Sequence, residues 1–240
     1  MTAKQGRAPV LAVDGPGGSG KGTICRRVAG AMGWHLLDSG ALYRAVAVYA
    51  GQRDVPLDDA EGLAKLAGEL PVAFEPAEDD TCVVLAGVDV TRELRAETTG
   101  DRASRVAAIP AVREALVQRQ RDFRKPPGLV ADGRDMGTVI FPDAEAKVFL
   151  TASARERARR RYKQLVEKGI DANIDRLYDE IVERDRRDEQ RAVAPLKPAP
   201  DARIIDTTTM SIDEVAESVI YFLIQRQRIV APQDAGPFYH

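Results

Sequence analysis

Histidine and cysteine are scarce in this sequence, which contains two of each among 240 residues. The cysteines, Cys25 and Cys82, lie far apart in the chain and belong to no CxxC pattern. The histidines, His35 and His240, are not spaced with them as zinc ligands are. We therefore expect no structural zinc site, and we interpret both cysteines as small buried hydrophobic residues in a reducing compartment.

Long apolar runs are also absent. No stretch approaches the roughly 20 apolar residues that a membrane-spanning helix needs. Residues 1–8 are polar and lead into no signal-peptide pattern. The formal net charge of −2 excludes a polycation of the nucleic-acid-binding type. We expect a cytoplasmic monomer that binds small molecules, with neither a membrane nor a nucleic acid as partner.

Apolar segments that suit buried strands alternate with segments that have the period of helices. Strands are predicted at residues 9–14, 35–38, 128–132, 147–150 and 203–206. Helices are predicted at 21–32, 41–50, 102–124, 154–168 and 174–187, with Pro110 breaking or kinking the third of them. A last helix follows the capping box of Ser211 and Glu214. This alternation predicts a parallel sheet with helices on both faces.

A different pattern occupies residues 72–91. Short β-type segments lie at 72–74, 82–85 and 88–90, with an acidic turn at 78–80. Such closely spaced short strands predict a small antiparallel meander. Because helical segments lie on either side of it, we interpret the meander as an insert carried on the main domain.

A glycine-rich segment follows the first predicted strand and opens the first helix. It consists of Gly15, Pro16, Gly17, Gly18, Ser19, Gly20, Lys21, Gly22 and Thr23. Glycine lets backbone N–H groups converge on phosphate oxygens without Cβ clashes, and a helix start adds unpaired N–H groups. Lys21 adds a mobile charge for the β and γ phosphates. In this strand-to-helix context the segment predicts a nucleoside triphosphate site, where a chance glycine-rich turn is the alternative.

The segment departs from the usual phosphate-loop pattern at one position. Gly22 stands where a Ser or Thr usually contacts the metal ion, and Thr23 follows one residue later. We expect Mg²⁺ near Thr23, with Ser19 as an alternative. Asp132 ends a predicted strand, as does the acidic residue that supports Mg²⁺ in other phosphate-loop proteins, directly or through water. The alternative for Asp132 is a structural carboxylate that accepts neighbouring N–H groups.

Polar residues gather where other predicted strands end, and ligands of parallel sheets collect there. Residues 38–44 follow one strand, residues 131–137 follow another, and arginines crowd residues 184–191. Phosphoryl transfer requires positive charge and N–H donors around two phosphates in line. Arginine suits this task because its fork binds phosphate oxygens in pairs and stays charged. The pattern therefore predicts a second anion site beside the first.

Four stretches together resemble the bacterial cytidylate kinases, a branch of the nucleoside monophosphate kinases. They are GPGGSGKGT at 15–23, DSGALYR at 38–44, DGRDMGTVIFPDA at 132–144 and ERDRRDEQRAVAPL at 183–196. The resemblance extends over most of the chain, from Pro9 to Gln225. It implies an enzyme of pyrimidine nucleotide metabolism that transfers the γ-phosphoryl group of MgATP to CMP or dCMP, giving CDP or dCDP and ADP.

The resemblance also implies a fold. We expect an α/β core of three layers with a parallel five-stranded sheet, formed by residues 9–38 and 106–228. A short helical lid over the donor is expected at residues 155–172. Residues 39–105 are expected to bind the monophosphate and to carry the β insert at 70–92. Residues 229–240 are expected to form a frayed tail.

By resemblance, particular residues take particular roles. The monophosphate side is lined by Ser39, Tyr43, Arg44 and Arg134. Asp135 holds the ribose, and the cytosine is recognised by Ser104, Arg113 and Asp188. The catalytic group comprises Lys21, Asp132, Arg134, Arg184 and Arg191. The chemistry of the base agrees with this role for Asp188, because its carboxylate can accept a hydrogen bond from the cytosine amino group. Uracil has no amino group at that position and would leave the carboxylate unpaired. UMP is therefore expected to be the poorer substrate.

Several of these residues have plainer interpretations. Ser39 can cap the helix that it precedes, with or without a substrate contact. Arg184 and Arg191 are seven residues apart, which on a helix places them on one face with Asp188. An exposed, salt-bridged stripe is therefore their alternative. The arginines of residues 155–161 are expected to form a mostly solvated face, with Arg157 placed over the adenine or the phosphates of the donor.

Two other classes of function stay open. The first is a kinase for AMP, UMP or a non-nucleotide acceptor, which equal turnover of UMP and CMP would favour. The second is a nucleotide switch or an RNA-binding module built on the arginine helices. A switch would hold its nucleotide without a second phosphate acceptor, and an RNA-binding module would show a steep salt dependence. The near-neutral charge and the arginines beside an acceptor site disfavour this second class.

Overall fold

A parallel sheet forms the centre of the molecule. The structure, a computed structural model, describes residues 7–76, 81–167 and 169–230. Within these residues a five-stranded sheet has the order β2 (His35–Asp38), β6 (Leu129–Gly133), β1 (Val10–Asp14), β7 (Ala146–Thr151) and β8 (Arg203–Asp206). All neighbouring strands are parallel. The predicted sheet is confirmed, and each predicted strand agrees to within one residue at either end.

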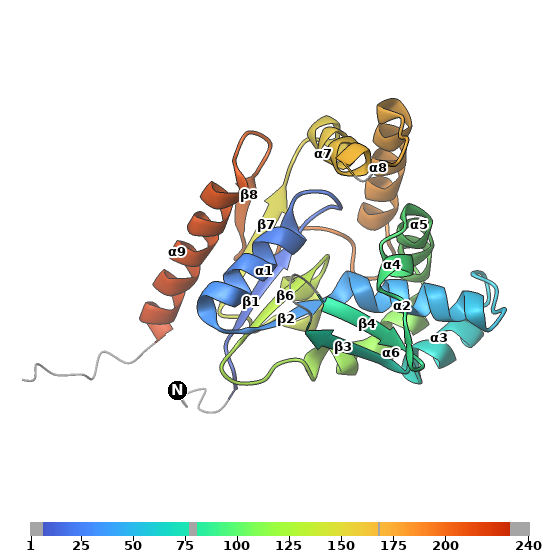
Figure 1. The fold of residues 1–240 in the computed structure, drawn as a ribbon. Helices are drawn as coiled ribbons and strands as arrows, with labels where there is room; N and C mark the ends of the chain where they lie inside the picture. Colours follow the sequence, from blue (N-terminus) through green and yellow to red (C-terminus); the bar gives the residue numbers. More distant parts are fainter. Residues whose placement is uncertain (1–6, 77–80, 168, 231–240) are drawn as a thin grey trace, which may run out of the picture.

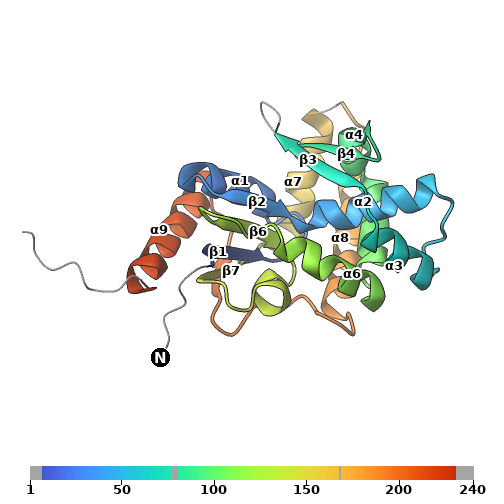
Figure 2. The same ribbon diagram turned by 90° about the horizontal axis from the view of Figure 1, so that it is seen from below.

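Helices cover both faces of the sheet because its central strands are apolar on both sides. In β1, Val10 and Ala12 pack into one buried core, and Leu11 and Val13 pack into another. The first core includes α2 (Ser39–Gln52), α3 (Ala60–Gly68) and α6 (Pro110–Arg121), and the second includes α1 (Lys21–Met32) and α9 (Ile212–Val230). Figures 1 and 2 both show α9 and α3 at opposite sides of the sheet.

A second, smaller sheet is antiparallel. In the described part of the chain it has the order β3 (Val72–Pro76), β4 (Thr81–Leu85) and β5 (Val88–Asp89). Val83 and Leu85 of β4 pack into the first core, together with α2. The predicted meander is confirmed, and the predicted acidic turn at 78–80 lies outside the described residues.

Pro110 breaks the helix that was predicted at 102–124. The chain forms α5 (Glu97–Val106) and then α6, in which Pro110 is the first residue. Proline suits that position because its missing N–H would have no partner within the helix. Two short helices, α3 and α4 (Thr91–Leu94), were not predicted, because helices of this length depend on tertiary packing more than on propensity.

Two arginine-rich helices lie beyond one end of the sheet. They are α7 (Ala154–Glu167) and α8 (Ile174–Glu189), which pack on each other through Ala158, Leu165 and Leu177. Figure 1 shows the pair beyond the end toward which the arrow of β7 points. Because ligands bind at that end of a parallel sheet, these helices are the candidate lid. None of the helices in the described ranges is both long and apolar enough to cross a bilayer.

Candidate active site

Residues 15–23, here named the donor loop, consist of the turn that joins β1 to α1 and the first three residues of α1. Gly15, Gly18 and Gly20 have φ angles of 147°, 78° and 91°, which lie in the left-handed region that favours glycine. Gly15 has a second constraint, because a Cβ there would overlap the carbonyl oxygen of Leu150 on β7. The close turn of the loop over the sheet therefore requires glycine at this position.

We expect Gly15→Ala to lower the free energy of unfolding by about 2–3 kcal/mol, the usual cost of forcing an extra methyl group into a packed site. The matched control is Gly30→Ala on α1, where a Cβ would meet no atom within 4 Å. The control should raise stability by up to about 1 kcal/mol because alanine favours helix. Urea unfolding of both variants measures the difference, and equal stabilities would contradict the steric argument.

Two side chains of the donor loop fold back onto one carbonyl oxygen. Lys21 Nζ donates to Pro16 O at 2.8 Å, and Ser19 Oγ donates to the same oxygen at 3.0 Å. Burial and, to a smaller extent, the charge of Arg134 lower the pKa of Lys21 to about 8, against the opposing effect of Asp132. The ammonium group is thus held at the loop, where a polyphosphate would stabilise its charged form.

Asp132 is buried on β6 beside the start of α1. Its Oδ2 lies 3.6 Å from the position that a Cβ would take on Gly22. Burial raises the pKa of Asp132 to about 6, and Lys21 opposes this shift. The alternative for Asp132 was a structural carboxylate that accepts neighbouring N–H groups. In the structure this role belongs to Asp14, which accepts from the backbone N–H of Met136 at 2.7 Å.

The donor loop also fits a magnesium ion. The described residues contain no group of three or more His, Cys, Asp or Glu side chains that could hold a metal. Mg²⁺ does not need such a cage, because it binds one or two carboxylates and substrate phosphates and keeps several waters. Asp132 supplies one buried carboxylate, and the half-buried Thr23 lines the same cavity.

Two guanidinium groups lie against the donor loop at Gly17. Arg134 Nη2 is 3.4 Å, and Arg184 Cζ is 3.6 Å, from the position that a Cβ would take there. Burial lowers the pKa of Arg184 to about 10, and Arg134 adds to this shift. Arg184 Nε has no hydrogen-bond partner in the part of the chain that is described. Two guanidinium groups gathered in this way have the charge and the N–H donors that a phosphate group would need.

Asp188 connects Arg134 to Arg191. Its Oδ2 accepts from Arg134 Nε at 2.9 Å, and its Oδ1 lies 3.0 Å from Arg191 Nη2. Burial would raise the pKa of Asp188, but Arg134, Arg191 and Arg184 outweigh it and hold the pKa below the usual value. The alternative of an exposed, salt-bridged stripe is wrong, because the side chains of Arg191 and Asp188 are only 3% and 5% exposed. The prediction that Arg184 and Arg191 share one face of a helix is also wrong, because α8 ends at Glu189 and Arg191 lies beyond its end.

A second buried ion pair joins Arg113 to Asp135. Arg113 Nη2 donates to Asp135 Oδ2, and Arg113 Nη1 donates to Ala107 O at 3.2 Å. The guanidinium also lies 5.6 Å from the centre of the Tyr43 ring. Ser104 Oγ is buried and has no hydrogen-bond partner among the described residues. A polar ligand would satisfy that hydroxyl, since buried polar groups are rarely left unpaired.

The start of α2 brings further polar groups to the site. Asp38 Oδ1 accepts from Ala41 N at 3.0 Å and caps the helix, so the interpretation of Ser39 as the cap is wrong. Ser39 is buried as the first residue of α2, and its Oγ lies 2.8 Å from the position of a Cβ on Gly133. Its hydroxyl is therefore placed at the carboxyl end of β6, next to Arg134.

Arg157 ties α7 and α8 to the donor loop. Its Nη1 donates to Gly17 O at 3.0 Å and to Asp185 Oδ1 at 2.9 Å, and its Nε donates to Ala152 O at 3.0 Å. The residue is buried, unlike the solvated face expected for its neighbours. The structure thus places Arg157 against the loop that is predicted to hold the donor phosphates.

Arg160 and Thr207 were missed as site residues. Arg160 Nη1 donates to Thr207 Oγ1 at 3.1 Å, and that hydroxyl donates to Ser19 O at 3.2 Å. Arg160 was expected on the solvated face, and Thr207 carried no signal at all. Their contact forms only when α7 folds against the chain that follows β8, which no local pattern reveals.

One cavity of about 1420 Å³ unites the donor loop with the buried ion pairs. The sequence-predicted residues that line it are Gly17, Gly18, Ser19, Gly20, Lys21, Gly22, Thr23, Ser39, Tyr43, Arg44, Ser104, Arg113, Asp132, Arg134, Asp135, Arg157, Arg184, Asp188 and Arg191. Gly15 and Pro16 are not among the lining residues; they turn the chain and supply the carbonyl that holds Lys21. A donor loop that opens into a second, arginine-rich anion site on a parallel sheet defines the protein as a P-loop kinase.

Comparison with known proteins narrows this class. The model of the cytidylate kinase family matches residues 11–225. The cytidylate kinase of Aeromonas hydrophila is 58% identical over 219 residues, which cover 91% of this chain and 95% of that protein. The cytidylate kinase of Proteus mirabilis is 56% identical over 214 residues, which cover 89% of this chain and 95% of that protein. The chain belongs to the cytidylate kinase family, and it is an enzyme of this type.

Among solved structures, a gluconokinase from Sinorhizobium meliloti can be superposed on this chain with 14% sequence identity and a TM-score of 0.48. The superposition covers 92% of this chain and 95% of the gluconokinase. That likeness is too distant to bear on function. The family assignment depends on the sequence relatives, and the site described above depends on this chain's own residues.

Proposed function

We propose that this protein transfers the γ-phosphoryl group of ATP, held with Mg²⁺, to CMP and dCMP, forming ADP and CDP or dCDP. The observation that carries the proposal is the continuous cavity in which the donor loop meets Arg134 and Arg184 at Gly17. The acceptor follows from the relatives, since proteins 58% and 56% identical to this chain are cytidylate kinases.

Direct in-line transfer suits the charges around Gly17. Such a transfer needs two anions held end to end with positive charge around the moving group. Lys21 and the N–H groups of the donor loop hold the donor, while Arg134, Arg184 and Arg191 neutralise the charge on the transferring group. The attacking oxygen belongs to an acceptor phosphate that is already anionic. No strong general base and no covalent enzyme intermediate are therefore required.

Asp132 and Thr23 would hold the metal ion, directly or through water. When bound, Mg²⁺ supplies positive charge to the phosphates of the donor. Closure of α7 and α8 over the donor would exclude water and suppress wasteful hydrolysis. Arg157 supports this lid role, because it joins α7 and Asp185 of α8 to Gly17 of the donor loop. Residues 39–105 would then form the part that binds the monophosphate.

Two carboxylates, Asp135 and Asp188, are candidates to face the base. Asp188 is bonded to Arg134, which lies against the donor loop, whereas Asp135 is bonded to Arg113 over Tyr43. In a nucleoside monophosphate the sugar adjoins the phosphate and the base lies beyond it. We therefore place Asp188 toward the sugar, and Asp135 with Arg113 toward the base. This exchanges the roles that the family resemblance implies for the two carboxylates.

We expect Asp135→Asn to lower the ratio of kcat/KM for CMP to that for UMP by about tenfold or more, because the amide presents a donor to the cytosine amino group. Asp188→Asn serves as the matched variant. It should lower the turnover of both nucleotides and change the ratio by less than about threefold. Steady-state kinetics with CMP and UMP measure both ratios. If only Asp188→Asn lost selectivity between CMP and UMP, Asp188 and not Asp135 would be the carboxylate that recognises the base.

An ADP-release assay with ATP, Mg²⁺ and each nucleoside monophosphate in turn tests the proposed function. CMP and dCMP should give the highest turnover, and removal of Mg²⁺ with EDTA should abolish it. Equal turnover of CMP and UMP would indicate a kinase of broader specificity. Binding of ATP without transfer to any monophosphate would overturn the proposal and favour a nucleotide switch.

A further inference from the structure

Asp14 is a buried carboxylate that the proposed mechanism does not use. It is the last residue of β1, directly before the donor loop, and it is 4% exposed. Its Oδ1 accepts from Met136 N at 2.7 Å, and its Oδ2 accepts from Gly137 N at 2.8 Å. The carboxylate thus crosses from the strand that leads into the donor loop to the chain that follows β6.

The chain that Asp14 holds is a turn of π-helix, Met136–Ile140. The first N–H groups of any helical turn lack acceptors within the turn and need a cap. Asp135 stands at the capping position but makes no side-chain hydrogen bond to the turn, and its Oδ2 accepts from Arg113. Asp14 therefore supplies the cap from the neighbouring strand and leaves Asp135 available to the cavity.

The geometry points to Asp14 as a positioning residue that fixes Arg134 and Asp135 relative to the donor loop. Asp14 pairs with Gly133 in the sheet and holds the N–H groups of Met136 and Gly137, so it secures both sides of the Arg134–Asp135 dipeptide. The donor loop begins at the next residue after Asp14. This inference rests on the proposed function, because it assigns Asp14 a role in the transfer to the acceptor.

The surroundings of Asp14 support a functional role over a purely stabilising one. Burial raises the pKa of Asp14 to about 7, although the N–H groups of Gly137 and Met136 oppose the shift. Asp135 contributes to this value by raising the pKa, and Lys21 contributes by lowering it. A carboxylate held in this position loses much of its solvation, which makes it a weak source of stability.

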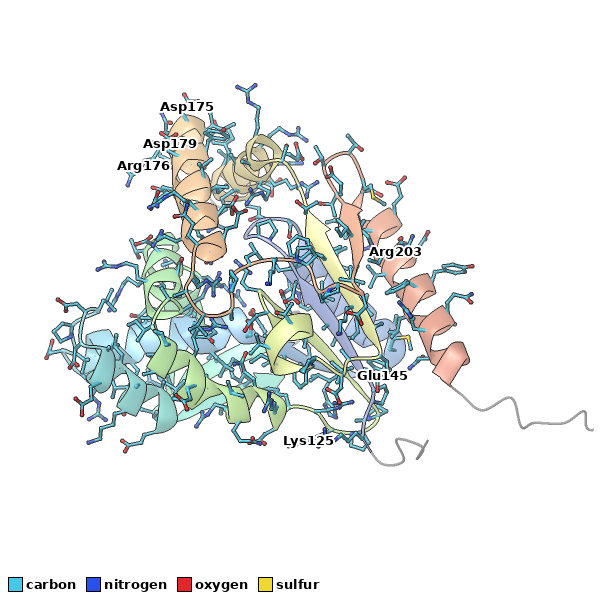
Figure 3. All side chains as sticks on the ribbon, turned by 180° about the vertical axis from the view of Figure 1, so that it is seen from behind. Lys125, Glu145, Asp175, Arg176, Asp179 and Arg203 are labelled. Carbon is cyan, nitrogen blue, oxygen red and sulfur yellow. The ribbon has the colours of Figure 1, made fainter. Side chains whose placement is uncertain are left out.

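The test compares Asp14→Asn with Glu145→Gln in the full chain. Glu145 is the matched control because its Oε2 accepts from Val10 N at 2.6 Å, at the opposite end of β1. Figure 3 shows Glu145 at the end of the sheet remote from α8, where Asp175 is labelled. Both changes remove a carboxylate that binds a backbone N–H of the same sheet region. Only the change at Asp14 should disturb the acceptor site.

We expect Asp14→Asn to lower kcat/KM for CMP by about 10- to 100-fold, the scale of a small misplacement of catalytic groups. The KM for CMP should rise, while the KM for ATP should change by less than about twofold. Loss of folded protein alone would lower kcat and leave both KM values unchanged. Amide hydrogen exchange of residues 134–141 should accelerate in Asp14→Asn and not in Glu145→Gln. Unchanged KM for CMP, or equal effects of the two variants, would overturn the inference.

A double-mutant cycle with Arg134→Met identifies the route of the effect. If Asp14 acts through Arg134, then Asp14→Asn should cost less in the Arg134→Met background than in the wild type. If Asp14→Asn lowered kcat/KM by the same factor in the Arg134→Met background as in the wild type, Asp14 would not act through Arg134. If Asp14→Asn does not fold, Gly137→Ala replaces it, since its Cβ would lie 3.4 Å from Asp14 Oδ2 and would otherwise come closest to the flexible side chain of Lys147, at 3.1 Å. Wild-type protein that is inactive with CMP would refute the proposed function, whereas an active wild type with an unaffected variant would refute only this inference.

Discussion

Replacing Lys21 with methionine is expected to lower the turnover of phosphoryl transfer by about 10²-fold or more, the scale seen when one stabilising donor is removed. Lys21 is buried, and its Nζ is held at the donor loop by the carbonyl oxygen of Pro16. Methionine keeps the length of the side chain and removes the charge. The comparison of kcat between wild type and Lys21→Met at saturating ATP and CMP measures the loss.

Lys147→Met is the matched control for this experiment. Lys147 is also buried, and its Nζ donates to the carbonyl of a proline five residues earlier, Pro142, just as Lys21 donates to Pro16. Its charge is paired with Asp201, outside the cavity. We expect Lys147→Met to lower stability and to leave kcat of the folded enzyme unchanged. Equal kcat values for the two variants would contradict the role of Lys21.

The lowered pKa of Lys21 adds a pH dependence. In the free protein the pKa is about 8, so Lys21 loses its proton as the pH rises through that value. Only the protonated form attracts the donor phosphates. The affinity for ATP should therefore weaken above pH 8 in the wild type, and this change should be absent from Lys21→Met. Titration calorimetry at a series of pH values measures the effect.

Replacing Arg184 with methionine is expected to lower kcat by about 10²-fold or more without lowering the thermal midpoint. Arg184 lies at Gly17 beside Arg134, and burial together with Arg134 lowers its pKa to about 10. A cation whose charged form is disfavoured in the folded state opposes folding at neutral pH. Removal of this charge should therefore lower kcat and leave the free energy of unfolding unchanged or higher. Steady-state kinetics and thermal unfolding measure the two effects separately.

The control for Arg184→Met is Arg186→Met on the same helix. Arg186 is exposed, and its guanidinium bonds only to Glu183 and Gln190 in the described structure. Exposed pairs of this kind contribute about 0–1 kcal/mol, so stability and kcat should both stay close to wild type. If Arg184→Met unfolded at a lower temperature and kept its activity, Arg184 would be a structural residue.

The donor loop and the strands could be predicted because their signals are local. Gly15 to Thr23 form one uninterrupted stretch, and Gly15, Gly18 and Gly20 are favoured by the left-handed backbone conformation at their own positions. The apolar runs of β1 and β6 are likewise contiguous. Since the carboxyl ends of parallel strands meet at one edge, the sequence also predicted that Asp132 and Arg134 lie near the loop, as they do.

Other parts of the site depend on segments that meet only in the fold. The bond from Met136 N to Asp14 joins residues 122 positions apart, and the bond from Arg157 Nη1 to Asp185 joins two helices. Arg191 was misplaced on a helix because a seven-residue spacing indicates a shared face only where the helix continues, and α8 ends at Glu189. Ser39 was misjudged as a cap because Asp38, one residue earlier, reaches the same N–H groups.

By itself the sequence determined the form of the donor loop: a glycine-rich turn, a helix start and one lysine, all contiguous and governed by local backbone freedom. The tertiary structure decided which charges face one another across the cavity. Arg134 and Arg184 meet at Gly17, Asp188 is shared between Arg134 and Arg191, and Asp14 caps the helical turn that follows β6. The reason is physical: side chains of this kind are set by long-range packing and burial, which the spacing of residues along the chain does not contain.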